Sequence, residues 1–262
     1  MPAGPVLHAG AECGNDAAMS DIAAAIAVAD VGPELNPALD REALAAEFRA
    51  KGRIHIPNIL TPESAQRLYQ VLRDETIWRL TLNKDGNFLD FPNLSPEERK
   101  KIALGAWQRA QAEFQYLFDI HRLSHEGEPY ADPRHYFARM VAFLNAPHFL
   151  SFIREVTGLT EIARTDGQAT LYRPGDFLTQ HDDRYGGRHR LAAYVFNMTP
   201  VWKPDFGGVL NFYDARGHVE EGYVPTFNAL NIFRVPAVHS VSQVAIFGGY
   251  RYSVTGWFHA KK

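Results

Sequence analysis

The spacing of apolar residues along the chain changes near residue 160. Before that point apolar residues recur at helical intervals, as over residues 39–51, where Leu39, Leu44 and Phe48 fall near one helical face and Gly52 ends the helix. After it, short β-rich runs are separated by Gly, Pro, Asn and Asp. Many closely spaced strands are typical of a sandwich or barrel rather than of alternating βαβ units.

The pattern predicts one domain over residues 37–262, with helical support over about 37–158 and a β core over about 159–260. Three further helices are expected: one from Pro62, one from the capping-box pair Ser95 and Glu98 to about Phe118, and one from Pro147 to Gly158. Residues 1–36 are rich in Ala, Gly and Pro and are expected to form a flexible leader.

Composition narrows the classes of partner. The formal net charge is −3 and no basic run appears, so nucleic acid is not expected as a direct ligand. Cys13 is the single cysteine, which excludes a disulfide framework and a cysteine-rich zinc site. No apolar run reaches the roughly 18 residues of a membrane span, and residues 1–21 lack the features of a signal peptide. A cytoplasmic protein without a membrane partner is expected.

The stretch "QHDDRYGG" (180–187) follows a strand-like run and precedes a glycine turn. His181 and Asp183 are two residues apart, so their side chains can converge at a strand end, whereas Asp182 projects to the other face. His239 opens a later β-run. Two histidines and one carboxylate form the facial triad of non-haem Fe(II) oxygenases.

A candidate anion site follows in "RYSVTGWFH". Arg251 and Ser253 share one strand face, which offers a guanidinium fork and a hydroxyl to a carboxylate. A dicarboxylic 2-oxo acid could chelate the metal at one end and meet Arg251 at the other.

Residues 171–259 resemble a known family through "LYRPGDFLTQHDD", "FGGVLNFYD" and "HSVSQV…RYSVTGWFH". They are similar to the Fe(II)- and 2-oxoglutarate-dependent dioxygenases of the prolyl-hydroxylase type, and most like the catalytic domain of the prolyl 3-hydroxylases that modify a ribosomal protein. The resemblance implies an α+β fold with a double-stranded β-helix (jelly-roll, cupin-like) core and supporting N-terminal helices.

The resemblance also assigns roles to residues. It implies His181, Asp183 and His239 as catalytic iron ligands and Arg251 as the partner of the distal carboxylate of 2-oxoglutarate. The remaining matches place Tyr194 on the same carboxylate, Tyr172 along the pocket, and Thr255 and Trp257 in the wall of the site.

The implied activity is hydroxylation of an unactivated C–H bond with Fe(II), 2-oxoglutarate and O₂, and ascorbate as a possible reductant. A prolyl residue of a protein or peptide is the expected substrate; a free amino acid or another small metabolite is the alternative. A non-catalytic 2-oxoglutarate sensor would be expected to lack part of the triad or the arginine, and a cupin-like enzyme without 2-oxoglutarate would lack the Arg251 and Ser253 pair. The intact aspartate argues against a halogenase. The sequence leaves the oligomeric state open.

Substrate choice is expected in three irregular segments, residues 81–94, 124–137 and 183–190. In the last, Arg184, Arg188 and Arg190 form either an acid-binding set or an ordinary solvated loop. Two rival metal sites are weaker. His121 and His125 are interpreted as the end of a helix, since the glutamate of HExxH is missing. His218 and Glu220 are interpreted as part of a loop.

Overall fold

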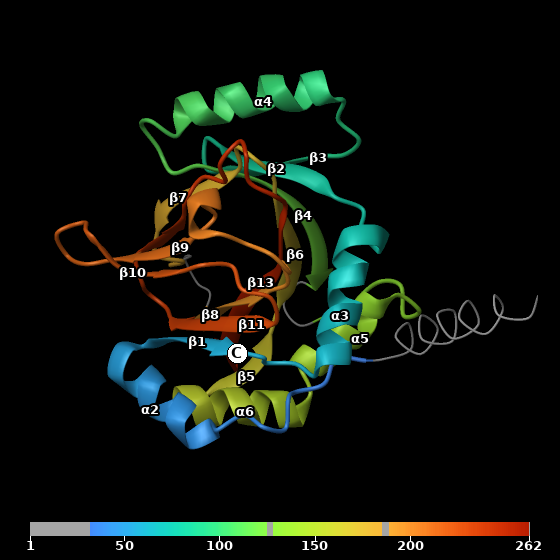
Figure 1. Ribbon diagram of the computed structural model, residues 1–262, viewed down its shortest axis with the longest axis vertical. Helices are drawn as coiled ribbons and strands as arrows, with labels where there is room; N and C mark the ends of the chain where they lie inside the picture. Colours follow the sequence, from blue (N-terminus) through green and yellow to red (C-terminus); the bar gives the residue numbers. More distant parts are fainter. Residues whose placement is uncertain (1–31, 125–127, 185–188, 262) are drawn as a thin grey trace, which may run out of the picture. The chain divides into compact units, whose positions relative to one another are not determined.

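The computed structural model describes residues 32–124, 128–184 and 189–261 (Figure 1). The chain divides into two units, Met1–Val31 and Gly32–Lys262, and the first lies outside the described residues. The expected leader therefore remains a prediction over residues 1–31. At its end, Leu35 forms a β-bridge with Leu60, and the Asn36 amide donates to the Ile59 carbonyl at 2.9 Å.

Antiparallel strands dominate the second unit, and the described strands join into one thirteen-stranded sheet. They are β1 (Arg53–Pro57), β2 (Arg79–Lys84), β3 (Asn87–Phe91), β4 (Tyr116–Ser124), β5 (Ile162–Thr165), β6 (Gly167–Tyr172), β7 (Phe177–His181), β8 (Arg190–Asn197), β9 (Leu210–Tyr213), β10 (Val219–Tyr223), β11 (Ala229–Arg234), β12 (His239–Val241) and β13 (Arg251–Ala260). The main order is β1-β11-β8-β13-β6-β4-β7-β12-β9-β10. The sheet curls so that it nearly closes on itself (Figure 1).

Side chains close the seam between the end strands β1 and β10. Arg53 donates to Glu221 at 2.5 Å and to Glu220 at 2.9 Å. The rings of His55 and Tyr223 lie 5.6 Å apart at the same seam. The barrel therefore closes there without a backbone ladder between β1 and β10 among the described strands.

In Figure 1, helix α4 (Pro96–Arg109) lies above the barrel, α3 (Pro62–Gln70) and α5 (Tyr136–Leu144) lie to its right, and α2 (Arg41–Lys51) and α6 (Pro147–Thr157) lie below it. Short helical turns lie at Val71–Glu75 and Pro204–Phe206. Asp40 caps the start of helix α2 and its carboxylate accepts from the Ala43 amide, and Gly52 caps the end in the left-handed region. An ion pair between Arg41 and Glu155 joins α2 to α6 at 2.6 Å.

Strand alternation gives the barrel two different faces. On β13, Tyr252, Val254 and Phe258 pack outward into the core shared with the helices. Arg251 and the residues two apart from it turn to the opposite, inner face, where Phe212 and Phe233 are among the packed side chains. The inner face therefore carries the polar residues of interest, and the outer face supplies most of the hydrophobic support.

The expected helices from residues 39, 62, 95 and 147 are present, and Ser95 with Glu98 forms the predicted capping box. The helix that begins after Ser95 was predicted too long, because α4 ends at Arg109 and Phe118 lies on β4. His121 is also on β4, where it contacts the Ile77 carbonyl and the Tyr130 hydroxyl, so the helix-end interpretation is wrong. His125 lies outside the described residues.

Three strands of the expected helical half, β2, β3 and β4, were not foreseen. The loop interpretation of "HVEE" is also wrong for all but His218, because β10 begins at Val219 and includes Glu220. The predicted α+β class with a β core toward the end of the chain is confirmed. Among the described helices, none combines the length and the apolar character required to cross a membrane.

Replacing Gly256 with Ala should destabilise the protein. Gly256 pairs with Tyr194, and a Cβ there would lie 2.8 Å from the Tyr194 hydroxyl and would collide with the Asp166 carbonyl oxygen. We expect a loss of about 1–3 kcal/mol in the free energy of unfolding, measured by urea denaturation. Gly32→Ala is the control, since nothing lies within 4 Å of its Cβ position. Equal stability of the two variants would contradict the close packing at Gly256.

Candidate metal centre and the arginine site

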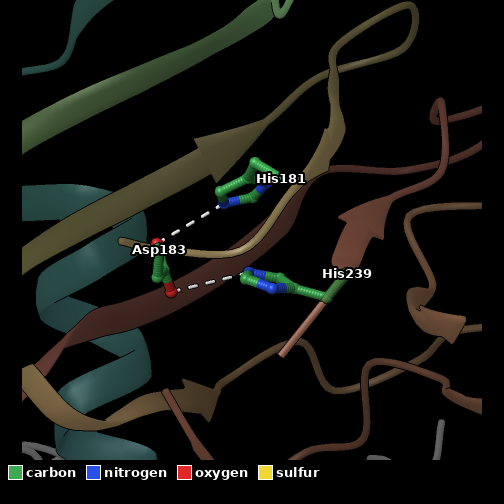
Figure 2. A group of neighbouring side chains, drawn as sticks. All are labelled: His181, Asp183 and His239. Atoms are coloured by element: carbon green, nitrogen blue, oxygen red, sulfur yellow. Dashed lines mark ion pairs between the residues drawn. The ribbon is translucent and has the colours of Figure 1, made fainter. Parts of the chain in front are cut away.

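His181, Asp183 and His239 meet at one end of the barrel (Figure 2). His181 ends β7 and His239 begins β12, and the two residues are direct partners in the antiparallel ladder. Asp183 follows in the left-handed region, with φ of 62°. One candidate ligand atom from each residue lies within 4.8 Å of the other two. Asp182 points elsewhere and pairs with Arg184 at 2.6 Å, as predicted from alternation.

Backbone carbonyls orient both imidazoles. The Nδ1 atom of His181 contacts the Thr179 carbonyl at 3.0 Å, and that of His239 contacts the Ala237 carbonyl at 2.8 Å. A carbonyl oxygen only accepts, so each Nδ1 carries the proton and donates. The Nε2 atoms then present lone pairs toward Asp183, whose two carboxylate oxygens lie 3.5 and 3.6 Å from them. Two imidazole lone pairs and a carboxylate facing one point are a donor set for a cation.

The protonation states favour metal binding at neutral pH. Burial and, to a lesser extent, the adjacent His181 lower the pKa of His239 to about 4, although Asp183 and the hydrogen bond to the Ala237 carbonyl oppose this. Burial raises the pKa of Asp183, but the interactions with His181 and His239 outweigh this effect and bring its pKa to about 2. His239 is therefore neutral and Asp183 ionised, which are the states that bind a metal ion.

Arg190 holds the backbone of Asp183 in place. Its Nη1 donates to the Asp183 main-chain carbonyl at 3.1 Å, and its guanidinium lies 3.6 Å from the centroid of the Trp257 ring. The cation–π stack fixes the arginine, and the arginine holds the backbone that carries the candidate ligand. Trp257 thus contributes to the site through Arg190.

Arg251 is a second unusual feature of the inner face. Only 2% of the residue is exposed. Within the described part of the chain, its Nε and Nη1 atoms have no hydrogen-bond partner. Burial lowers its pKa, although the nearby Tyr172 opposes this, with the guanidinium 5.0 Å from the centroid of the tyrosine ring. A buried cation without an anion costs several kcal/mol, so the arrangement fits an anionic ligand.

Hydroxyl and amide groups flank Arg251. Ser253 lies on the same face of β13 and shares a hydrogen bond of 2.6 Å with Thr170. Asn197 is the partner of Ser253 on β8, and its Oδ1 has no hydrogen-bond partner among the described residues. Sequence reasoning missed Thr170 and Asn197, and it considered Arg190 only for an acid-binding set or a solvated loop, whereas Arg190 begins β8 and stacks on Trp257. Thr170 could have been inferred from its position two residues before Tyr172, but the placement of the others requires the strand register.

The remaining predicted residues divide between the two faces. Tyr172 lies beside Arg251, and Thr255 lies on the inner row of β13 opposite Val195. Tyr194 does not join them. It packs in the outer core against Phe258, and its hydroxyl donates to the Asp166 carbonyl at 2.8 Å. The expected contact of Tyr194 with a bound carboxylate is therefore wrong.

Comparison with known proteins identifies the family of this region. Residues 167–259 match the model of the 2OG-Fe(II) oxygenase superfamily. Prolyl 3-hydroxylase OGFOD1 of Mus musculus is 31% identical over 118 residues, which are 42% of this chain and 21% of the relative. The resemblance found in the sequence is thus confirmed as a match of residues 167–259 to this superfamily. The match spans about a fifth of the length of that curated relative.

Solved structures agree on the fold. An oxidoreductase of the 2OG-Fe(II) oxygenase family from Burkholderia pseudomallei superposes with a TM-score of 0.59 at 12% identity, over 87% of this chain and 95% of that chain. A Trichoplax adhaerens prolyl hydroxylase in complex with a hypoxia inducible factor peptide gives 0.53 at 14% identity, over 84% and 89%. The predicted double-stranded β-helix is thus confirmed.

A divalent metal ion should stabilise the protein through this centre. At a Mn(II) concentration about 100 times Kd, binding to the folded state alone adds about 2.7 kcal/mol, which raises the melting temperature. His239→Ala should remove this rise, because it deletes one of three ligands. His218→Ala is the control, since His218 lies in an exposed turn outside the cluster. An undiminished rise in His239→Ala would show that the metal binds elsewhere.

Proposed function

We propose that this protein is an Fe(II)- and 2-oxoglutarate-dependent dioxygenase that hydroxylates a prolyl residue of a protein or peptide. One observation carries the reaction class: three convergent metal-ligating side chains share the inner face of the barrel with a buried arginine, and the Nε and Nη1 atoms of that arginine have no hydrogen-bond partner among the described residues. The superfamily match supports the same class. The prolyl substrate rests on the curated relatives, whose names describe prolyl hydroxylases.

His181, Asp183 and His239 would hold Fe(II), leaving the remaining coordination positions for 2-oxoglutarate and O₂. The iron, when bound, couples the conversion of 2-oxoglutarate and O₂ to succinate and CO₂ with insertion of one oxygen atom into a substrate C–H bond. Ascorbate would serve as an external reductant that keeps the iron in the ferrous state. This assignment fits the ionised Asp183 and neutral His239.

Arg251 would bind the distal carboxylate of 2-oxoglutarate, with its unsatisfied N–H groups donating to the carboxylate oxygens. The hydroxyls of Ser253 and Thr170 supply further donors beside it. Tyr172 excludes water on one side of the guanidinium, which strengthens the ion pair by lowering the local dielectric constant. We further infer a cytoplasmic location, as the sequence favours.

Arg251→Met should separate stability from ligand binding. The substitution removes a buried charge that forms no ion pair within the part of the chain that the structure describes, so the ligand-free variant should unfold at the same or a higher temperature than the wild type. It should also lose the 2-oxoglutarate-dependent rise in melting temperature that the Mn(II)-loaded wild type shows. Arg216→Met, at an exposed arginine paired with Asp214, is the matched control. A retained rise in Arg251→Met would refute the role of Arg251.

Turnover provides the direct test of the reaction class. The Fe(II)-loaded protein, given 2-oxoglutarate and ascorbate, should form succinate slowly without its prime substrate and faster with a prolyl peptide that it hydroxylates. Asp183→Ala should reduce succinate formation at least a hundredfold, because it removes the only carboxylate of the triad. Succinate formation that is equal in Asp183→Ala and the wild type would overturn the proposal.

A further inference from the structure

A row of aromatic side chains adjoins the candidate metal centre. Phe114, in the connection between α4 and β4, has its ring 5.3 Å from that of His181. Tyr116 on β4 follows at 5.8 Å from Phe114, and Phe88 on β3 lies 6.5 Å from Tyr116. We call Phe88, Phe114 and Tyr116 the aromatic row. Strands β2, β3, β4 and β7 gather at this end of the barrel, below α4 (Figure 1).

The row joins the surface to the interior. Phe88 and Phe114 are 41% and 42% exposed. From Tyr116 the ring contacts continue to the buried Phe118 at 5.4 Å, and from Phe118 to Tyr172 at 4.9 Å. Tyr172 contacts Arg251. Exposed aromatic rings therefore lie at the metal centre and connect to the proposed 2-oxoglutarate site, whereas the buried members are ordinary core residues.

The backbone under the row is firmly held. Gln115, between Phe114 and Tyr116, is fully buried and forms side-chain hydrogen bonds with both backbone groups of Asn83 on β2, at 2.8 and 2.7 Å. Its own backbone bonds to Thr179 on β7, two residues before His181. One buried glutamine thus ties the aromatic row to the strand that carries a candidate ligand. Such a surface binds a partner with little ordering cost.

The outer end of the row is also fixed. The Arg122 guanidinium lies 4.4 Å from the centroid of the Phe88 ring, and Arg79 pairs with Asp90 across the β2–β3 hairpin at 2.9 Å. The cation–π contact orients Phe88 while leaving two-fifths of the residue exposed. The exposed rings are therefore held in place instead of collapsing into the core.

We propose that the aromatic row binds the peptide segment that carries the target prolyl residue, with proline rings packed against Phe114 and Tyr116 and the extended chain reaching Phe88. This assignment rests on the proposed function. Proline-bearing segments adopt extended, pre-organised conformations and dock on rigid aromatic surfaces at low entropic cost. The row is continuous with the metal centre through the contact of Phe114 with His181, so a segment bound there has a residue at the centre itself.

The test measures peptide binding without turnover. Isothermal titration calorimetry would compare a ten-residue polyproline peptide with a Gly-Ser peptide of equal length, on protein loaded with Mn(II) and 2-oxoglutarate. The wild type should bind the polyproline peptide and not the Gly-Ser peptide. Phe114→Ala should weaken polyproline binding at least tenfold and leave the 2-oxoglutarate affinity unchanged. Phe247→Ala, at a phenylalanine that is 68% exposed and whose ring lies 6.3 Å from that of Phe206, should bind as the wild type does.

Each result bears on one claim. Equal polyproline affinity of Phe114→Ala and the wild type would overturn the aromatic row as the binding surface, as would a wild type that does not prefer the polyproline peptide. Loss of 2-oxoglutarate binding in Phe114→Ala would also overturn it, because the residue would then act on the co-substrate site. Failure of the wild type to bind 2-oxoglutarate at all would instead refute the proposed function, and the same titration series distinguishes this case.

Discussion

The site depends on the burial of a guanidinium and of three metal-ligating side chains on the inner face of a nearly closed barrel. Arg251 is 2% exposed, its Nε and Nη1 atoms find no hydrogen-bond partner in the described parts of the chain, and it lies there together with three metal-ligating side chains. A buried guanidinium and a buried carboxylate are both costly in a low-dielectric interior, and a ligand of opposite charge lowers that cost for each. The outer core, where Val254 and Phe258 pack under the helices, supplies the burial that tolerates this arrangement. The structure thus concentrates its unfavourable electrostatics where ligands of opposite charge can remove them.

Strand register determines where these polar side chains lie relative to one another. The pairing of His181 with His239 places two imidazoles side by side, and backbone carbonyls then fix which nitrogen faces Asp183. Alternation along β13 places Arg251 and Ser253 on the same face as Thr255 and Trp257. The aromatic row extends the site to the surface through Gln115, which bonds to the strand of His181. The proposed co-substrate site and the proposed peptide surface therefore share one hydrogen-bonded framework of strands.

Much of this site could be predicted from sequence, because two-residue alternation is a local property. Alternation assigned Asp183 to the face of His181 and Asp182 to the other face, and it placed Arg251 and Ser253 on one face. The predicted role of Tyr194 could not be checked from sequence, because it depends on the pairing of β8 with β13. Tyr194 pairs with Gly256, which belongs to the outer-facing residues of β13. Asn197 was missed for the same reason. The segment around β4 was misassigned because Asp119 on its outer face is buried against Arg99 and Arg173, which hides the alternation expected of a strand.

The most direct test of the central claim is the visible charge-transfer absorbance that appears when 2-oxoglutarate chelates protein-bound Fe(II), recorded without oxygen. The account predicts that the band appears when 2-oxoglutarate is added to the Fe(II)-loaded wild type and saturates at one equivalent of bound iron. It predicts no band in Asp183→Ala, and a band only at much higher 2-oxoglutarate concentration in Arg251→Met. An Fe(II)-loaded wild type that shows no band at saturating 2-oxoglutarate would contradict the account.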